Sequence, residues 1–174
     1  YGMHHAHFVA DEQFPDWIDS SNIIYVKSSF KKIPAFYSRN TITGTERKIS
    51  TKAISSDNYF SYNNGKIVYS AFQPDIRWGW KNYEVIRVLD IETGKEKTLT
   101  QKTRYLSPDI SKDGKMIVAV HCGLSGTNEL HVLDAVNGNI ISNLPNPKDF
   151  IFTYPKFYGS EKVVSAVRNK AGEM

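Results

Sequence analysis

The chain has 174 residues, of which 40% are hydrophobic and 13% aromatic, and its formal net charge is +4. This length is enough for one domain with a substantial core, and the scattered Lys and Arg residues argue against nucleic acid as a partner, because nucleic-acid binders usually concentrate basic charge on one face. The single cysteine, Cys122, excludes an internal disulfide, and no apolar stretch reaches the roughly 18 residues of a membrane span.

Residues 1–13 show no clear periodicity and are predicted to be an irregular N-terminal segment. His4, His5 and His7 lie close together in this segment. A metal site needs further ligands that converge in space, so a loop or a frayed end is the favoured interpretation.

The remaining residues, 14–174, consist of short apolar runs separated by turn signals, which predicts successive units of strands. The first unit, residues 14–51, opens with Phe14–Trp17. Its predicted strands and turns are, in order, Ile23–Val26, a turn region at Lys31–Pro34, Ala35–Ser38, a turn at Thr43-Gly44, and Arg47–Ile49.

The second unit, residues 52–101, opens with Tyr59–Tyr62 and turns at Asn63–Gly65. Its predicted strands are Lys66–Ser70, Tyr83–Asp90 and Glu96–Thr100, with a turn at Glu92–Gly94. A long insert, Gln73–Trp80, separates the first two of these strands.

The third unit, residues 102–147, opens with Ser107–Asp109 and has a tight-turn signal at Lys112–Lys115. Its predicted strands are Met116–Val120, Leu130–Leu133 and Ile140–Ser142. Residues 148–174 begin a fourth unit, with an opening segment at Tyr154–Phe157 and one strand at Lys162–Val167. This last stretch is predicted to be a half-blade.

Markers at fixed positions show that the units repeat. The first strand begins at Ile23, Ile67, Met116 and Val163, in steps of 44, 49 and 47 residues. The turn glycines are Gly44, Gly94 and Gly138, and one proline position holds Pro15, Pro108 and Pro155, with Tyr59 in the second unit. Such a period predicts an all-β fold of β-propeller blades, about three and a half four-stranded antiparallel blades in an incomplete ring. A β-sandwich is the main rival, but it would not require such regular turns.

These residues resemble the TolB-like, or WD40-like (PD40), propeller repeat. The match rests on Ser107–Asp109 with Asp113–Lys115 and on Val88–Asp90 with Thr93-Gly94, and covers roughly residues 14–174. The resemblance implies a propeller of six to eight blades in a periplasmic, extracellular or cell-surface bacterial protein. Similar propellers precede the catalytic domain of prolyl-oligopeptidase-like serine peptidases, and some arrays carry a metallopeptidase domain.

No catalytic motif is visible in the chain, so we expect no enzyme activity, cofactor or metal. Gly123–Gly126 lacks the spacing of a nucleophile elbow. Asp109–Gly114 resembles the start of a calcium loop, but the position of the bidentate acid holds Val120, so a tight turn is favoured. Cys122 ends an apolar run, which favours a buried, inert thiol.

Two histidines, His121 and His131, are predicted on neighbouring strands of the third unit. They could face each other, but two histidines without a third ligand do not make a metal site. Strand packing or surface exposure is the favoured interpretation.

The insert of the second unit is the most informative departure from the repeat. Large amphipathic rings and guanidinium groups are enriched in binding hot spots, and loops between strands often carry function. The predicted binding residues are Arg77, Trp78, Trp80, Lys81 and Tyr83. The alternative, slightly favoured, is that the Trp side chains cap the blade core or plug the neighbouring blade.

The sequence thus favours a non-catalytic propeller module that binds or scaffolds a protein or ligand within a larger extracytoplasmic protein. An accessory propeller that controls access to a peptidase active site outside this chain is the second hypothesis. A third is an independent hydrolase or lyase whose polar residues gather at the propeller axis. About three and a half blades cannot close a ring, so we expect a truncated chain or self-association through the half-blade at 148–174.

Overall fold

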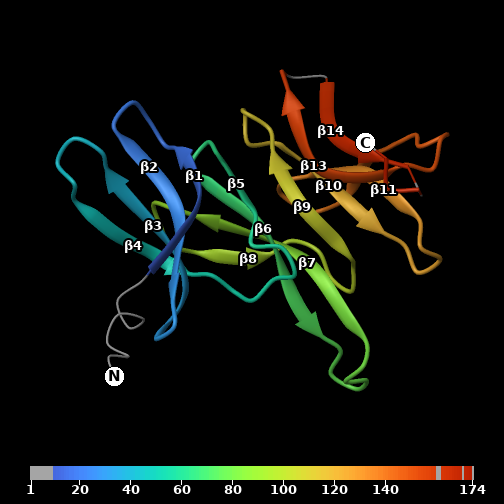
Figure 1. The fold of residues 1–174 in the computed structure, drawn as a ribbon, viewed down its shortest axis with the longest axis horizontal. Coiled ribbons are helices and arrows are strands. Elements are labelled where there is room, and N and C mark those ends of the chain that lie inside the picture. The colour runs from blue at the N-terminus through green and yellow to red at the C-terminus, as the bar shows by residue number, and fades with distance from the viewer. Residues whose placement is uncertain (1–9, 160–161, 170, 174) are drawn as a thin grey trace. The chain divides into compact units, whose positions relative to one another are not determined.

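The computed structural model describes residues 10–159, 162–169 and 171–173, and His4, His5 and His7 therefore lie outside the described residues. In the described part, every regular element is a β-strand (Figure 1). Its fourteen strands form three four-stranded sheets and one two-stranded sheet, all antiparallel. The expected all-β fold of about three and a half blades is confirmed. No helix with the length and apolar character of a membrane span occurs among the described residues.

The chain divides into two compact units, residues 1–53 and residues 54–174. In the first unit the described strands form one sheet in the order β1-β2-β3-β4. These strands are β1 (Ala10–Trp17), β2 (Asn22–Ser29), β3 (Lys32–Asn40) and β4 (Glu46–Thr51).

Two boundaries in this sheet differ from the sequence prediction. β1 begins at Ala10, inside the segment expected to be irregular up to residue 13, because Ala10 pairs with Ser29 at the end of β2. β3 already begins at Lys32, so the turn expected over residues 31–34 is confined to Phe30 and Lys31. Pro34 is therefore a strand residue.

The second unit contains three sheets. The first is formed by β5 (Phe60–Asn63), β6 (Lys66–Pro74), β7 (Asn82–Asp90) and β8 (Glu96–Thr98). The second is formed by β9 (Tyr105–Ile110), β10 (Met116–Cys122), β11 (Asn128–Asp134) and β12 (Ile140–Leu144). The third pairs β13 (Ile151–Tyr158) with β14 (Lys162–Arg168).

The strand registers define which residues are equivalent in successive blades. Ile67 pairs with Leu89, and Ile117 pairs with Leu133. Each leucine is followed directly by the aspartate of a turn. Ile117 is therefore the residue of the third unit that is equivalent to Ile67, and the strand start predicted from the sequence at Met116 was one residue early.

A β-bulge accounts for the repeated proline. The residue before the proline has a positive φ and the pairing register shifts there, as a bulge requires. These residues are Phe14, Ser107 and Tyr154, with φ of 55°, 47° and 48°. The pairing of β5 with β6 has no such shift, and Ser61 and Asp109 face equivalent partners on the next strand. Phe60, rather than Tyr59, thus takes the proline position in the second unit.

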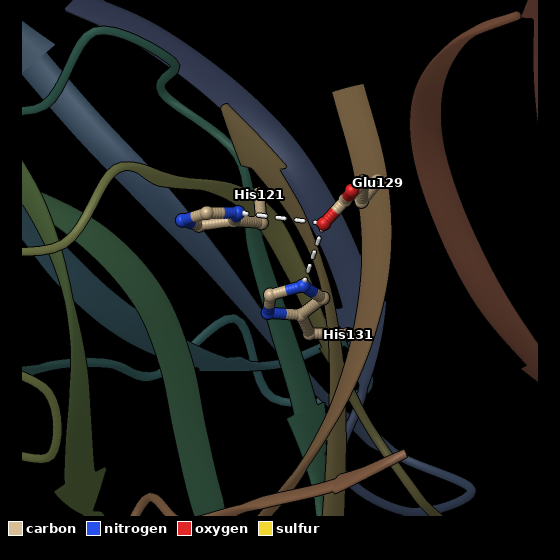
Figure 2. A group of neighbouring side chains, drawn as sticks. All are labelled: His121, Glu129 and His131. Atoms are coloured by element: carbon tan, nitrogen blue, oxygen red, sulfur yellow. Dashed lines mark hydrogen bonds and ion pairs between the residues drawn. The ribbon is translucent and has the colours of Figure 1, made fainter. Parts of the chain in front are cut away.

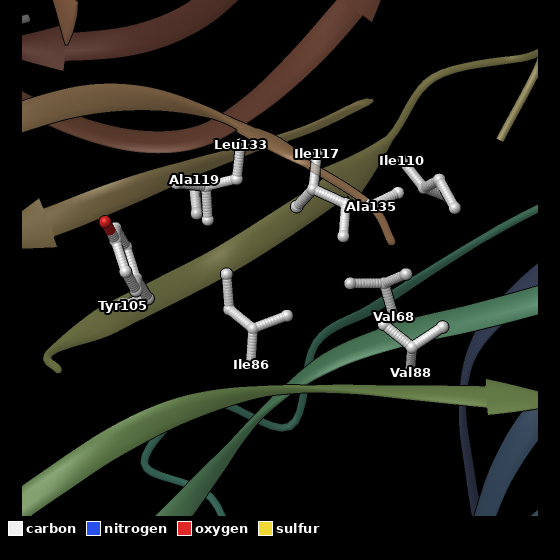
Figure 3. Close-up of a cluster of buried hydrophobic side chains, with 9 residues drawn as sticks. All are labelled: Val68, Ile86, Val88, Tyr105, Ile110, Ile117, Ala119, Leu133 and Ala135. Carbon is white, nitrogen blue, oxygen red and sulfur yellow. The ribbon is translucent and has the colours of Figure 1, made fainter. Parts of the chain in front are cut away.

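The core of the second unit lies between two of its sheets (Figure 3). Apolar side chains from β6 and β7 meet those of β9, β10 and β11. This is expected because successive residues of a strand point to opposite faces of its sheet, so that one face of each sheet can pack against the other sheet. The cluster consists of Val68, Ile86, Val88, Tyr105, Ile110, Ile117, Ala119, Leu133 and Ala135. The packed faces hold the two sheets together and leave their ends for the loops.

Candidate functional site

The predicted insert is the tip of a long hairpin. β6 and β7 pair without interruption from Lys66 opposite Asp90 to Pro74 opposite Asn82. Gln73 and Pro74, expected in the insert, are therefore strand residues, and the loop is reduced to residues 75–81. We call residues 75–81 the aromatic loop, and we call the end of a sheet where its second and third strands join the hairpin end.

Asp75 holds the aromatic loop in shape. Its carboxylate accepts hydrogen bonds from the backbone N–H groups of Arg77 (2.9 Å) and Trp78 (3.0 Å) and from the hydroxyl of Tyr83 (3.2 Å). The backbone N–H groups of Arg77 and Trp78 hold the pKa of the Asp75 carboxyl below its ordinary value, because they stabilise the ionised form. The loop is also closed by a hydrogen bond from the Asp75 N–H to the Lys81 carbonyl, at 3.0 Å.

The indole rings of the aromatic loop face solvent. Trp78 is 47% exposed and Trp80 is 78% exposed, and their ring centres lie 6.1 Å apart. The Arg77 guanidinium lies 5.4 Å from the centre of a Trp78 ring, within cation–π distance. These exposures do not fit the expectation that both Trp side chains cap or plug a blade core.

The structure places the predicted binding residues in two different settings. Arg77, Trp78 and Trp80 lie together on the exposed loop. Tyr83 is buried and anchors the loop through Asp75, while Lys81 has its ammonium 5.7 Å from the Tyr83 ring centre. Tyr83 is therefore a supporting residue and presents little surface of its own.

A hollow adjoins the aromatic loop at the hairpin ends of the β5–β8 and β9–β12 sheets. It consists of two neighbouring pockets of about 330 Å³ and about 530 Å³, which share Tyr83, Arg104 and Cys122. Trp80 lines the smaller pocket, and Lys81 and Lys102 line the larger one. We call the larger pocket the basic hollow, because three cationic side chains lie around it. Cys122 is partly buried, and burial raises the pKa of its thiol, as expected for an inert cysteine.

A second polar group lies at the same end of the β9–β12 sheet: His121, Glu129 and His131, here called the imidazole cluster (Figure 2). The two rings are stacked, with centres 4.5 Å apart. Glu129 Oε2 lies 3.2 Å from His131 Nε2 and 4.0 Å from His121 Nδ1. The Tyr105 hydroxyl is 2.9 Å from the other nitrogen of His131, Nδ1.

Burial shapes the acid–base properties of this cluster. Burial lowers the pKa of His121, the neighbouring His131 lowers it further, and Glu129 opposes both effects. Burial also raises the pKa of Tyr105 to about 12. His121 is thus favoured as the neutral imidazole, and Tyr105 keeps its proton over the physiological range.

Glu129 and Tyr105 were missed by sequence reasoning. For Glu129 the sequence did contain a signal: residues two apart on a strand share a face, which places Glu129 on the same face as His131. Completing the group needed the strand register, which sets Glu129 directly opposite His121 and Tyr105 opposite His121 on the other side. This register therefore brings a carboxylate next to the two histidines.

Asp109 does not act as a turn residue. It is 5% exposed, and its carboxylate accepts hydrogen bonds from Ser61 Oγ (2.8 Å), Lys156 Nζ (2.9 Å) and the Phe157 N–H (2.9 Å). Ser61, Asp109 and Lys156 occupy the same position in three successive blades. The tight-turn interpretation holds only for the neighbouring pair Asp113-Gly114, where Gly114 has a φ of 71°.

No family model and no curated protein matches this chain. Solved β-propellers share its fold, however. A TolB-type protein from Agrobacterium tumefaciens superposes with a TM-score of 0.66 at 20% identity, over 87% of this chain and 52% of its own. TolB from Acinetobacter baumannii gives 0.62 at 18% identity, over 94% of this chain and 42% of its own.

An acylaminoacyl peptidase from Pyrococcus horikoshii gives a TM-score of 0.62 at 15% identity, over 91% of this chain and 28% of its own. The chain therefore spans about half of the first of these three proteins and less of the others. At these identities the likeness shows the fold alone. The chain is a β-propeller module with a TolB-like fold.

Proposed function

We propose that this chain is a non-catalytic propeller module that binds an extended, acidic segment of a protein partner. The observation that carries the proposal is the aromatic loop, which exposes two indole rings, one of which, that of Trp80, lines the smaller pocket next to the basic hollow. Trp and Arg dominate the energetics of protein interfaces, because they combine a large contact area with a polar group.

The preformed loop and the positive charge of this surface support an extended acidic ligand. Asp75 fixes the loop before a partner arrives, which lowers the entropy cost of binding. Lys81, Lys102 and Arg104 line the hollow next to the rings, and cationic side chains attract acidic peptides and orient them. A strand-like peptide could place an apolar side chain against Trp80 and a carboxylate over the hollow.

Selection from a phage-displayed random peptide library tests the proposal without a known partner. The expected result is enrichment of acidic peptides that contain apolar or aromatic residues. Replacing both Trp78 and Trp80 by Ala should lower the affinity of the enriched peptides at least tenfold. This corresponds to a loss of about 1.4 kcal/mol or more in binding free energy, which is typical of hot-spot residues.

Phe30→Ala is the matched control, because Phe30 is a fully exposed aromatic residue at the corresponding hairpin turn of the first blade. Its loss should leave peptide affinity unchanged. Peptides that bind equally well to the double Trp variant, or a selection that enriches no acidic peptide, would contradict the proposed function.

An accessory role in a peptidase is the second candidate. The observation that favours it is the fold shared with the acylaminoacyl peptidase, in which the matched part makes up 28% of the peptidase's own chain. In that case the propeller would control access of peptides to catalytic residues outside this chain. Peptidase assays of the full-length gene product, with and without the two Trp substitutions, test this role. If the full-length gene product cleaved no peptide, the accessory peptidase role would be excluded.

We also propose that the module works outside the cytoplasm, as its TolB-like fold suggests, which fractionation of the source cells would test. Self-association is proposed through β14, because among the described residues β14 pairs only with β13. Light scattering over a range of concentrations should show dimers, and Val164→Lys should suppress them by placing a charge on this edge. A monomer at every concentration would exclude this contact.

A further inference from the structure

We propose that His121, Glu129 and His131 bind a divalent transition-metal ion of the zinc type. The site differs from the peptide-binding surface proposed above, because none of its residues belongs to the aromatic loop and only His121 lines the basic hollow. Three observations carry it: a shared face, spacing close to that of metal ligands, and a buried nitrogen with no hydrogen-bond partner among the described residues.

The strand register places the three side chains on one face of the β9–β12 sheet. His121 on β10 pairs directly with Glu129 on β11, and Ala119 pairs with His131. Because alternate residues of a strand share a face, His131 lies diagonally opposite His121. Figure 2 shows the two rings each with one nitrogen directed at the Glu129 carboxylate.

The spacing is close to what a small cation needs. The three donor atoms lie within 4.8 Å of one another, with 3.2 Å between His131 Nε2 and Glu129 Oε2. Two donors bound to a tetrahedral zinc ion at about 2.0–2.1 Å are about 3.4 Å apart. Because the two rings are stacked at an interplanar angle of 18°, their nitrogen lone pairs lie in nearly parallel planes, and the partly exposed His121 and Glu129 side chains would have to turn to bring all three donors onto one ion.

The donor atoms can present lone pairs. His121 Nδ1 is buried and makes no hydrogen bond within the described residues, an arrangement that costs free energy unless a partner binds there. His131 Nε2 lies 3.2 Å from Glu129 Oε2, and because a carboxylate only accepts, this nitrogen carries the proton when no metal is bound. Metal binding would shift the His131 proton to Nδ1, which then donates to the Tyr105 oxygen, and the Nε2 lone pair would face the ion. Tyr105 would then be a positioning residue, like the outer hydrogen-bond partners of histidines in known metal sites.

The donor set selects the class of metal. Two imidazoles and one carboxylate suit zinc and its neighbours, whereas calcium and magnesium prefer oxygen ligands alone. Three protein ligands leave a fourth position for water or for a ligand that enters from outside. His121 also lines the basic hollow, so this open position is next to a surface that solutes can reach.

Zinc titration by calorimetry tests the site in the full chain. The starting protein should carry His4→Ala, His5→Ala and His7→Ala, because these residues could bind zinc by themselves. One zinc ion per chain is expected. His121→Gln and Glu129→Gln should each weaken binding at least tenfold, and Tyr105→Phe should weaken it about tenfold.

Two further measurements separate a metal site from a structural hydrogen-bond network. Cobalt should give the strong visible absorption of a four-coordinate ion in the starting protein and lose it in Glu129→Gln. Excess zinc should raise the melting temperature of the starting protein but not of His121→Gln, because only a ligand of the folded state stabilises it.

Glu96→Gln is the matched control, since Glu96 is also a partly exposed strand glutamate with a hydrogen-bonded carboxylate. It should bind zinc like the starting protein. The proposal is overturned if the starting protein binds no zinc, or if His121→Gln and Glu129→Gln bind it as tightly as Glu96→Gln does.

Discussion

At the turn end of the three four-stranded blades, where the third strand meets the fourth, one arrangement occurs three times. A side-chain oxygen accepts hydrogen bonds from the backbone N–H groups two and three residues later, and a glycine with positive φ follows. The residues that supply this oxygen are Asn40, Asp90 and Asp134.

The hairpin ends of the same blades have nothing comparable in common. Phe30 and Lys31 suffice to join β2 to β3, whereas residues 75–81 join β6 to β7 and residues 123–127 join β10 to β11. The exposed Trp pair, the basic hollow and the imidazole cluster are all at hairpin ends.

The difference predicts that the chain separates folding from the binding proposed above. A turn that returns with each blade meets a geometric requirement that every blade shares. A loop that differs in each blade is free to carry a local chemistry. Substitutions at repeated positions should therefore affect stability, and substitutions at the hairpin ends should affect ligands.

The largest stability effect is expected for Asp109→Ala. Asp109 links three blades, and its removal leaves Ser61 Oγ and the Phe157 N–H without their acceptor inside the protein. The free energy of unfolding should fall by about 3 kcal/mol, measured by urea denaturation. Asp113→Ala, on the exposed turn nearby, should cost less than about 1 kcal/mol. Equal losses would show that Asp109 is an ordinary turn residue after all.

A smaller and sharper contrast is expected between two turn glycines. Gly94 and Gly138 have φ of 66° and 76°, which costs a residue with a side chain about 1 kcal/mol. A Cβ on Gly138 would also lie 2.6 Å from the Leu99 carbonyl oxygen, whereas Gly94 has nothing within 4 Å. Thermal or urea unfolding should show a loss of about 1 kcal/mol for Gly94→Ala and about 2 kcal/mol or more for Gly138→Ala.

If the two alanine variants were equally stable, the Leu99 contact would have relaxed at no cost. Neither variant should change peptide or zinc affinity, because both glycines are at turn ends. A change in either affinity would break the separation between the two ends of the blades.

The turn ends were largely predictable from the sequence, because their chemistry is local. The glycines and the strand runs between them stand at regular intervals, and these positions fixed the all-β blades. The repeated strand of the third unit was placed one residue early, since the turn between the paired residues Ile110 and Ile117 is one residue longer than the turn between Trp17 and Ile23 in the first blade. Turn lengths of this kind depend on strand pairing, which a search for repeated residue types does not show.

The candidate sites were predictable only in part, because they depend on contacts distant along the chain. The aromatic loop was found from composition alone, but the burial of Tyr83 required its contact with Asp75. Asp109 meets Lys156, which is 47 residues away, so the local motif indicated a turn. Glu129 joined the two histidines only once the strand register was known.

The smallest expected effect is an acid dependence that comes from the turn ends. Backbone N–H groups hold the pKa of Asp90 and Asp134 below the ordinary aspartate value of 3.8, chiefly those of Thr93 and Asn137. A carboxyl with a lowered pKa in the folded state stabilises it fully above the ordinary value. This stabilisation is lost as the pH falls below about 4 and passes through the folded-state pKa.

The first blade already contains the control for this prediction, because Asn40 makes the same turn without a titratable group. Asp90→Asn with Asp134→Asn should therefore fold normally at neutral pH. Urea unfolding at pH values from about 5 down to about 3 should give a shallower fall in unfolding free energy for this double variant. If the slope were unchanged, the carboxylates at the turn ends would not be the groups that link acid to stability, and the charged turns of Asp90 and Asp134 would stabilise the fold no differently from the neutral turn of Asn40.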